Sequence, residues 1–471
     1  MGDLPEGDMT VESHLWSGRF ADAPDPDVFQ WQASFAFDRR LFEDDVVGSL
    51  AWAEALASAG VLTTADASKI RDGLSAILEE GRRDPRFVDG PDEDVHAFVE
   101  RKLIERVGDL GRRLHTGRSR NEQVSLDLRL YLRRRLRIAQ DAIVWCVRAI
   151  AGQATAAGTT IMPAYTHLRR AQPMLMAHFF LAHAAALRRD HTRIALARDE
   201  ADALPLGSGA VVGTSYGIDP HALASQLGFG RVVENSLDSA ADRDFVSSTL
   251  HAYALLMVHL SRIAEDLIIF TGDEFGFFEL ADRVATGSSA MPQKKNPDPL
   301  ELARGKTGRV IGHLTGFLTT LKGLPSGYNK DLQEDKEALF DAEAAVLGSL
   351  RATTAVIESL VIRGERSEAA ATGLLLATDV ADYLVRRGMP FRRAHEVVGR
   401  IVRDLSEDDR DFASLTPEEW RGYHPSFDAN IVNRITARGS IEAHKTPQST
   451  NPVAVNAVLS DVLAWIRVHD E

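Results

Sequence analysis

Apolar residues recur at helical spacing through the middle of the chain. From position 128 to position 150 they follow one another at steps of three or four: Leu128, Leu132, Leu136, Ala139, Ile143, Val147 and Ile150. This period matches one face of an α-helix and not the alternation of a strand. Similar patterns run through 173–204, 242–270, 299–322 and 331–363. We therefore predict five long helices.

The flanks of these helices have a different pattern. Before about His115 the helical runs are short and broken by prolines, and after about Gly364 short runs alternate with turns. The alternating pattern of a large sheet is missing. We predict an all-α fold of three regions: an N-terminal helical domain (1–115), a central long-helix bundle (116–364) and a small C-terminal helical domain (365–471).

The length of the central helices bears on assembly. A helix of about 30 residues spans roughly 45 Å at about 1.5 Å per residue, which is more than one small bundle needs. We expect the apolar faces to continue into partner subunits. Four arginines fall between the apolar positions, and we interpret them as a solvated or interfacial face rather than a ligand site: Arg129, Arg133, Arg134 and Arg137.

Composition and charge exclude several classes of protein. The 471 residues are 44% hydrophobic, enough for a substantial core, and the net charge of −14 disfavours nucleic acid or an anionic membrane as partner. Cys146 is the single cysteine and lies in an apolar helical pattern, as a buried thiol in a reducing compartment would. Residues 1–13 are acidic without a basic residue, so no targeting peptide is expected. Charged residues interrupt 250–270, the most apolar long stretch, so no membrane span is expected.

Residues 287–298 carry the strongest chemical signal. They read G-S-S-A-M-P-Q-K-K-N-P-D and combine a glycine and two hydroxyls with Lys294 and Asn296. Such a loop can bind an anion, because hydroxyls, amides and ammonium groups donate to carboxylate oxygens. The alternative is an ordinary polar loop between helices.

This loop resembles the signature of the fumarase/aspartase superfamily. Its lysine-lysine-asparagine ending is similar to the argininosuccinate lyase/delta-crystallin branch, as are G-L-P-S-G-Y-N-K-D-L-Q-E-D-K-E at 323–337 and L-W-S-G-R-F at 15–20. H-T-G-R-S-R-N-E-Q at 115–123 and Y-T-H-L-R-R-A-Q-P at 165–173 extend the resemblance over nearly the whole chain. It implies a fumarase/aspartase-type fold whose central bundle assembles into a tetrameric helical core, with each active site shared by three subunits.

The resemblance also implies a reaction, which is anti β-elimination of L-argininosuccinate to L-arginine and fumarate. This is the last step of arginine biosynthesis, carried out in the cytoplasm without a cofactor. By resemblance His167 is the general acid, Ser288 the general base, Lys294 stabilises charge and Glu301 pairs with the histidine. Substrate-binding positions carried over in the same way are Ser34, Asn121, Thr166, Asn296, Tyr328, Gln333 and Lys336. The chemistry of the substrate adds Ser119 as a donor and Arg118 or Arg120 as a cation beside Lys336.

The chemistry explains why such residues should converge. The proton to be removed lies on carbon beside a carboxylate, and its loss creates a dianionic aci-carboxylate that donors and cations must stabilise. The departing guanidino nitrogen needs a proton from a general acid on the opposite face. A free serine hydroxyl is too weak a base near neutral pH, so the loop must stabilise an alkoxide.

Each assignment has a plainer alternative on sequence alone. His167 could be a helix-start or packing histidine, and Glu301 a first-turn glutamate after Pro299. Gln333 and Lys336 could belong to a solvated helix start. Among enzymes the rival is adenylosuccinate lyase, and from another class the rival is a catalytically silent scaffold protein.

Two further features concern the surroundings of the site. Asp92, Glu93, Asp94 and His96 follow Pro91, which fits a charged helix N-terminus better than a metal site, so we expect no metal. Asp94 is expected to approach the active centre. Glu122 and Gly327 depart from the branch's pattern of an aspartate after Asn121 and a bulkier residue before Tyr328, and we expect them to affect substrate affinity.

Overall fold

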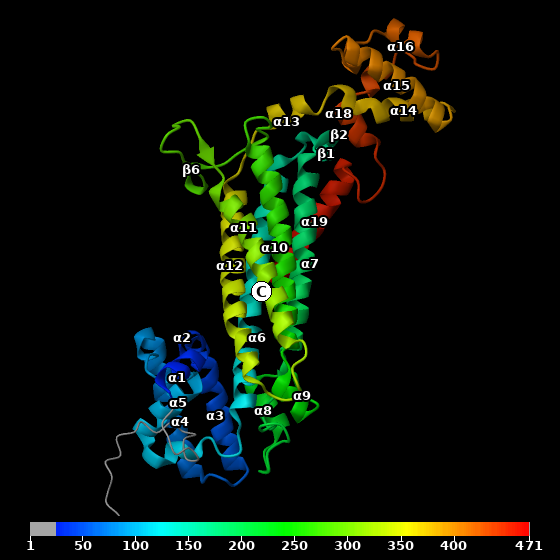
Figure 1. The fold of residues 1–471 in the computed structure, drawn as a ribbon. Coiled ribbons are helices and arrows are strands. Elements are labelled where there is room, and N and C mark those ends of the chain that lie inside the picture. Colours follow the sequence, from blue (N-terminus) through cyan, green and yellow to red (C-terminus); the bar gives the residue numbers. More distant parts are fainter. Residues whose placement is uncertain (1–24, 471) are drawn as a thin grey trace, which may run out of the picture. The chain divides into compact units, whose positions relative to one another are not determined.

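The computed structural model describes residues 25–470 (Figure 1). The acidic segment 1–13 and the motif at 15–20 lie outside the described residues. The chain forms two compact units, each built from several stretches of sequence. The first contains the described residues up to 137, together with 196–250 and 313–341, and the second contains 138–195, 251–312 and residues from 342 onward. The three predicted domain boundaries stay a prediction.

Five long helices dominate the fold, as the sequence predicts. They are α6 (Arg120–Ala157), α7 (Met176–Glu200), α10 (Asp244–Thr271), α11 (Asp298–Leu321) and α12 (Asp335–Ser359). Within the second unit, parts of these helices lie side by side (Figure 1). Polar contacts tie them together: Thr307 on α11 donates to the Met257 carbonyl on α10 at 3.1 Å, and Gln153 on α6 donates to the Ile357 carbonyl on α12 at 2.7 Å.

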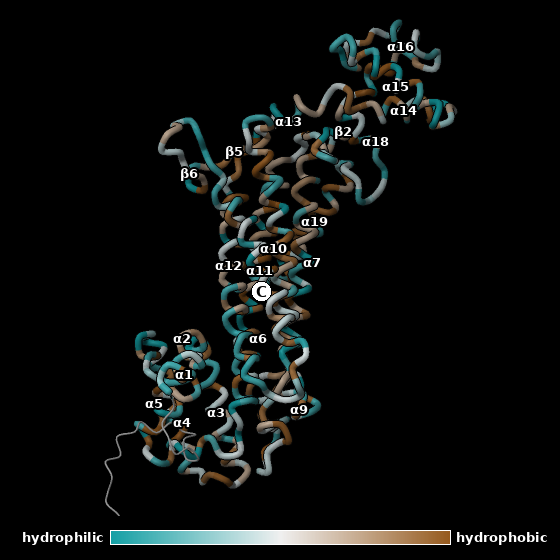
Figure 2. The backbone as a smooth tube through the Cα atoms, in the orientation of Figure 1, coloured by the Kyte–Doolittle hydropathy of each residue, from teal (hydrophilic) through white to brown (hydrophobic). Residues whose placement is uncertain are grey.

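The predicted apolar face of α6 is buried. All seven positions of the pattern between Leu128 and Ile150 are at most 1% exposed. Apolar and polar stretches alternate along the long helices (Figure 2). Cys146 is buried on the same helix, and burial raises the pKa of its thiol to about 12, so it is an unreactive packing residue.

The arginines of α6 lie at interfaces inside the first unit. Arg129 is buried, where it pairs with Asp242 and stacks 4.2 Å from the centre of the Phe245 ring. Arg133 pairs with Asp202 at 2.8 Å, and Arg134 pairs with Asp44 at 2.9 Å. The expectation of an interfacial face is confirmed for these three side chains. A solvated position is wrong for Arg129, because a carboxylate and an aromatic face replace its water.

The strands in the described residues form two-stranded pairs only. β1 (Ile161–Thr166) pairs antiparallel with β2 (Arg169–Leu175), and β6 (Thr286–Gly287) pairs antiparallel with β7 (Lys295–Asn296). The other pairs are β3 (Ala203–Leu204) with β4 (Arg231–Val232) and β5 (Phe278–Glu279) with β8 (Val361–Ile362). The helix predicted for 173–204 therefore begins only at Met176. Its first three residues belong to β2, where Pro163 faces Pro173 across the hairpin and proline favours extended backbone over the helix interior.

Shorter helices make up the rest of the first unit. They are α1 (Pro26–Gln32), α2 (Phe35–Asp38), η2 (Arg39–Leu41), α3 (Phe42–Ser58), α4 (Thr64–Arg83), η3 (Pro85–Phe87), α5 (Val95–Val107), η4 (Gly108–Arg113), α8 (Pro220–Leu227), α9 (Ser236–Ala241) and η6 (Lys330–Glu334). Asp94 caps α5 by accepting from the Ala97 amide at 2.7 Å, which confirms a charged helix N-terminus after Pro91.

The C-terminal helices belong to the second unit and include a small core of their own. They are α13 (Gly364–Ala370), η7 (Gly373–Leu376), α14 (Ala377–Val385), α15 (Phe391–Glu407), η8 (Phe412–Ser414), α16 (Pro417–Tyr423), α17 (Ile431–Arg434), α18 (Ala437–Ala443) and α19 (Pro452–His469), and η5 (Asp282–Val284) lies earlier in that unit. The core gathers Val380, Leu384, Ile401, Trp420 and Phe427. Among the described residues, no helix is both long enough and apolar enough to cross a bilayer.

A tight contact in the N-terminal helices gives a stability test. A Cβ added at Gly81 on α4 would lie 2.2 Å from Cε1 of the buried Phe42 ring. Gly81→Ala should therefore lower the free energy of unfolding by about 1–3 kcal/mol through overpacking, measured by the denaturant midpoint. Gly399→Ala is the matched control, because nothing lies within 4 Å of its added Cβ. That control should leave stability unchanged or raise it by about 0.5–1 kcal/mol, and equal effects at both positions would contradict the packing argument.

Candidate active site

Ser34 sits where two helices of the first unit meet. Its hydroxyl donates to Asp38 Oδ2 at 2.5 Å, and the Val95 amide of α5 donates to Asp38 Oδ1 at 3.0 Å. The amides of Ser34 and Phe35 both donate to the Glu93 carbonyl, at 2.8 and 3.1 Å. Burial raises the pKa of Asp38 to about 6. These bonds fix the Ser34 hydroxyl against the first turn of α5.

The polar loop before α6 joins the same region. Arg120 Nη1 pairs with Asp94 Oδ2 at 3.0 Å, so Asp94 contacts a predicted substrate-binding residue. The Asn121 amide donates to the Ser119 hydroxyl at 3.2 Å, and the Asn121 side chain donates to the Ala210 carbonyl at 3.4 Å. The predicted residues Ser119, Arg120 and Asn121 thus adjoin the N-terminus of α5.

The side chain of Glu122 holds this loop in place through hydrogen bonds to main-chain amides. Its carboxylate is buried and accepts three amides, from Ser119 at 3.0 Å, Gly207 at 2.8 Å and Gly209 at 3.0 Å. Its immediate partners are therefore main-chain groups of the protein. Gly327, the other departure, has a φ of +84°, and an added Cβ would lie 3.3 Å from Val211 Cγ1. A bulkier residue at position 327 would strain this backbone conformation.

The segment 328–336 contains the remaining predicted substrate-binding residues of the first unit. Gln333 Nε2 donates to the Gln32 carbonyl at 3.2 Å, close in sequence to Ser34. Lys336 is buried and its ammonium pairs with Asp335 at 2.9 Å, while Arg243 pairs with the other oxygen of Asp335 at 2.6 Å. Lys336 also lowers the pKa of Asp38, against the larger effect of burial.

Tyr328 remains a hydrogen-bond donor at neutral pH. Burial raises the pKa of its phenol to about 12, and the carboxylates of Asp335 and Asp94 act in the same direction. The first unit therefore gathers seven of the predicted positions around the starts of α2, α5, α6 and α12. They are Ser34, Ser119, Arg120, Asn121, Tyr328, Gln333 and Lys336.

Thr166 and His167 lie at the tip of the β1–β2 hairpin in the second unit. Thr166 pairs with Arg169, so His167 and Leu168 are the two turn residues, and both have a φ of 55°. A two-residue hairpin turn requires such backbone angles, which residues with side chains adopt at a cost. The tip is exposed, and at its base the Tyr165 ring packs within 5.5 Å of the Phe270 ring. The plainer reading of His167 as a helix-start residue is wrong, because the position is a hairpin turn.

The 287–298 loop is also a hairpin of the second unit. Thr286 faces Asn296 and Gly287 faces Lys295, so residues 288–294 form its tip. The Ser288 hydroxyl oxygen accepts the amides of Ala290 at 3.3 Å and Met291 at 3.1 Å. Two main-chain donors thus point at the oxygen predicted to act as the base.

A wide depression of about 1240 Å³ lies beside this hairpin. Its lining includes Lys294, Asn296 and Glu301, together with Arg363 and Arg366, all from the second unit. Glu301 is exposed, and its carboxylate lies 3.9 Å from Arg304 on the same helix. Neither Ser288 nor His167 is among the described residues that line the depression. The predicted pair of Glu301 with His167 stays a prediction.

Comparison with known proteins identifies the family. A family model described as "Lyase" matches residues 18–312, and one described as "Argininosuccinate lyase C-terminal" matches residues 374–442. The argininosuccinate lyase of Thioalkalivibrio sulfidiphilus is 48% identical over 94% of this chain and 95% of its own length. That of Moorella thermoacetica is 45% identical over 96% of this chain and 98% of its own length. The chain belongs to the argininosuccinate lyase family.

Solved structures agree with this family assignment. A variant of EDDS lyase with bound fumarate superimposes with a TM-score of 0.82 at 25% identity, covering 96% of this chain and 92% of its own. A fumarate lyase from Mesorhizobium gives a TM-score of 0.74 at 19% identity, covering 92% and 97%. The likeness confirms the all-α, fumarase/aspartase-type fold, and membership of the argininosuccinate lyase family confirms that the chain is a lyase.

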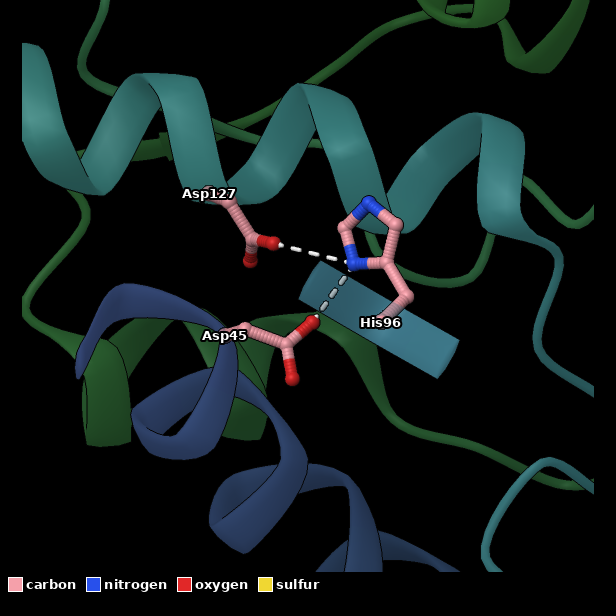
Figure 3. Close-up of side chains that lie close together, drawn as sticks. All are labelled: Asp45, His96 and Asp127. Atoms are coloured by element: carbon pink, nitrogen blue, oxygen red, sulfur yellow. Dashed lines mark hydrogen bonds and ion pairs between the residues drawn. The ribbon is translucent and has the colours of Figure 1, made fainter. Parts of the chain in front are cut away.

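Sequence reasoning missed one buried cluster in this family member. His96 Nδ1 lies 2.6 Å from Asp45 Oδ2 and 3.4 Å from Asp127 Oδ2 (Figure 3). Gln123 Nε2 donates to the same Asp45 oxygen at 2.6 Å. The cluster joins α3, α5 and α6 directly beneath the Ser119–Asn121 loop. Residue spacing gave no signal, because its members come from three separate helices.

A proton on His96 Nδ1, rather than a metal ion, accounts for the short distances in this cluster. The three ligand-type atoms lie within 4.8 Å of one another, as in a metal site. However, 2.6 Å is the length of a charge-assisted hydrogen bond, and the buried Arg118 already supplies positive charge to Asp45. Burial alone would lower the pKa of His96, but the hydrogen bond with Asp45 and the nearby carboxylates of Asp94 and Asp38 raise it above its usual value. Burial and the neighbouring Asp45 raise the pKa of Asp127 well above its usual value, so the residues fit an imidazolium paired with the Asp45 carboxylate, beside a protonated Asp127.

The raised pKa of His96 makes its contribution to stability pH-dependent. The stabilisation is fully present below the unfolded pKa of about 6.5 and is lost as pH rises through the higher folded value. His96→Gln should therefore cost about 3 kcal/mol at pH 6 and measurably less at pH 9, read from denaturant midpoints of variant and parent. Exposed His221, replaced by Gln, is the control and should show no difference at either pH. A loss of equal size at both pH values would contradict a charged imidazole.

Proposed function

We propose that this chain splits argininosuccinate into arginine and fumarate by anti β-elimination, the last step of arginine biosynthesis. The observation that carries the proposal is the 48% identity, over 94% of the chain, to a protein named argininosuccinate lyase. The match of residues 374–442 to the C-terminal region named after the same enzyme adds support. The rival activity, on adenylosuccinate, has no comparable observation in its favour.

Ser288 removes the carbon-bound proton in the proposed reaction. An alkoxide is required, and the Ala290 and Met291 amides that donate to this oxygen stabilise its anionic form. Lys294 is close in sequence on the same hairpin and adds positive charge. Lys294 and Asn296 meet the negative charge that develops on the substrate carboxylate.

His167 delivers the proton to the departing guanidino nitrogen. Its place at an exposed hairpin tip, with positive φ at two successive residues with side chains, supports a functional rather than a packing role. Thr166 beside it offers a hydroxyl to the substrate. Glu301 holds the imidazole in the protonation state that a general acid needs.

The first unit supplies the binding groups for the substrate's polar ends. Arg120 and Lys336 provide cations for its carboxylates, and Tyr328 provides a phenol that stays protonated at neutral pH. Amide and hydroxyl groups complete the set: Ser34, Ser119, Asn121 and Gln333. This mixture matches a ligand with three carboxylates and one guanidinium.

The active enzyme is a homotetramer whose sites are each built from three subunits. Within the described residues no hydrogen bond joins His167 to Ser288 or Glu301, and in the proposed assembly residues of other copies complete the site. Apolar side chains exposed on α11 support such assembly, since Leu302, Ile311 and Leu318 are 60%, 41% and 50% exposed in the single chain. We place the reaction in the cytoplasm, where the buried thiol of Cys146 suits a reducing environment.

Turnover of argininosuccinate tests the proposed acid. Purified enzyme should release fumarate, followed by its absorbance, and His167→Asn should lower kcat by about 10²–10⁴-fold because one general acid typically contributes that much. His221→Asn is the matched control and should keep full activity. Unchanged turnover in His167→Asn would remove it as the acid, and turnover of adenylosuccinate alone would overturn the substrate assignment.

Mixed tetramers test whether the sites are shared. The variants His167→Asn and Ser288→Ala should each be inactive alone. When they are unfolded together and refolded, some sites receive a native His167 from one chain and a native Ser288 from another. Activity should then reappear in the mixture, measured as fumarate release. If the mixture stays inactive while the parent enzyme refolds with activity under the same conditions, the acid and the base belong to one chain.

A further inference from the structure

A basic groove lies in the C-terminal helices, and the proposed reaction does not use it. It has a volume of about 560 Å³, within the usual range for small-ligand sites. Five cationic or imidazole side chains line it, from α15 and the loop after α16: Arg393, His395, Arg400, Arg403 and His424. Glu396 is the one carboxylate in the lining. We call this feature the α15 groove.

The arginines of the α15 groove lack the partners that neighbouring arginines have. Arg387 pairs with Asp428, Arg410 pairs with Glu419 at 2.9 Å and Arg421 pairs with Glu418 at 3.3 Å. Within residues 25–470, by contrast, Arg393, Arg400 and Arg403 form no ion pair. The chain has a net charge of −14, so its overall electrostatic potential is negative. The unpaired cations make the potential around the α15 groove locally positive.

Helix stability does not explain this arrangement. Arg392 and Arg393 occupy the first turn of α15, next to the positive end of the helix dipole, whereas Asp404 and Glu407 lie in its last turn. Each of these charges sits at the helix end that disfavours it. The buried face of α15 is formed by other residues, including Val397 and Ile401, so packing does not require the arginines either. A bound anion would compensate both the dipole and the mutual repulsion of the arginines.

The spacing of the cations indicates an elongated anion. Arg393 and Arg403 are ten residues apart on one helix, or about 15 Å at about 1.5 Å per residue. A single phosphate cannot contact both, whereas a chain of phosphates can bridge flexible side chains along that stretch. The Ser426 amide donates to Nδ1 of His424, which leaves Nε2 of that ring as a donor. Exposed Phe391 lies 6.2 Å from the His395 ring, at the edge of the groove.

We propose that the α15 groove binds an oligophosphate anion, such as the triphosphate of a nucleotide. Arg393, Arg400 and Arg403 hold the phosphates through guanidinium hydrogen bonds, whose planar geometry matches phosphate oxygens. Nε2 of His424 adds a further donor. Where the phosphates belong to a nucleotide, Phe391 offers a face for the base.

Calorimetric titration of the full-length enzyme tests the proposal. Tripolyphosphate is added at low ionic strength to the parent and to the double variant Arg400→Gln/Arg403→Gln. The expected result is saturable binding to the parent, weakened at least tenfold in the double variant. The charge-matched control is Arg434→Gln/Arg438→Gln, which removes two exposed arginines of the same region outside the groove and should keep parental affinity. Circular dichroism melting confirms that each variant folds, and the single variant Arg400→Gln replaces any double variant that does not.

The outcomes separate the possible sources of the phosphates. A nucleoside triphosphate that binds more tightly than tripolyphosphate, with the gain lost in Phe391→Ala, identifies a nucleotide. Equal affinity identifies a bare oligophosphate, and both results support the groove. Three results overturn the proposal: no binding of either ligand, equal weakening in the charge-matched control, or binding of a single-stranded oligonucleotide without binding of tripolyphosphate. None of these results depends on argininosuccinate turnover.

Discussion

Buried charge around the first turns of α6 holds the first unit of the molecule together. Glu122 accepts three amides from two loops, Arg118 donates to Ser49 on α3 at 3.1 Å, and Gln123 and His96 share the carboxylate of Asp45. Burying these charges is costly unless each finds its partner. The loop from Arg118 to Asn121 can therefore adopt only the path that satisfies all of them. This requirement places its hydroxyl, guanidinium and amide groups, together with the contacts of Arg120 to Asp94 and of Asn121 to the Ala210 carbonyl.

The same logic extends along the helix. Arg129 is taken out of water by Asp242 and the face of Phe245, and Arg134 meets Asp44, whose pKa burial raises to about 7 despite that arginine. An apolar core alone would hold these helices without fixing their register closely. Ionic contacts at fixed positions along α6 can fix how far each neighbouring segment is shifted along this helix. A shift of one turn would leave charges buried and unpaired.

The period of apolar residues was enough to predict the long helices and their buried faces. It was not enough to predict segments whose structure is decided by prolines or by ion pairs rather than by apolar spacing. The strand before α7 escaped notice because its apolar residues, Met174 and Leu175, continue the helical pattern, and only the paired prolines of the hairpin exclude a helix there. Arg129 was expected on a solvated or interfacial face, and nothing in the sequence reveals that Asp242, more than a hundred residues away, neutralises it. The His96 cluster was missed for the same reason.

Candidate site residues were recognised because they lie in short motifs, but a motif does not tell how its side chain is held. Ser288 was expected to need main-chain donors, and the two amides at its oxygen meet that need within its own hairpin. Glu122 was expected to affect substrate affinity as the neighbour of a binding residue, and its three main-chain partners show that it supports the loop. The difference lies in burial, which a single sequence does not record.

The exposure of His167 and the partial exposure of Ser288 follow from the kind of site that has been proposed. A catalytic group that serves a pocket formed within its own chain can be buried by that chain, but a group that serves a site between subunits must project from its own surface. Both residues lie on two-stranded hairpins, whose backbone hydrogen bonds are satisfied between the strands and need no further covering. The His167 hairpin is rooted by Tyr165 in a cluster of aromatic rings, so its tip can be exposed and still fixed in direction. Such hairpins can deliver an acid and a base to a shared site without moving the long helices that support them.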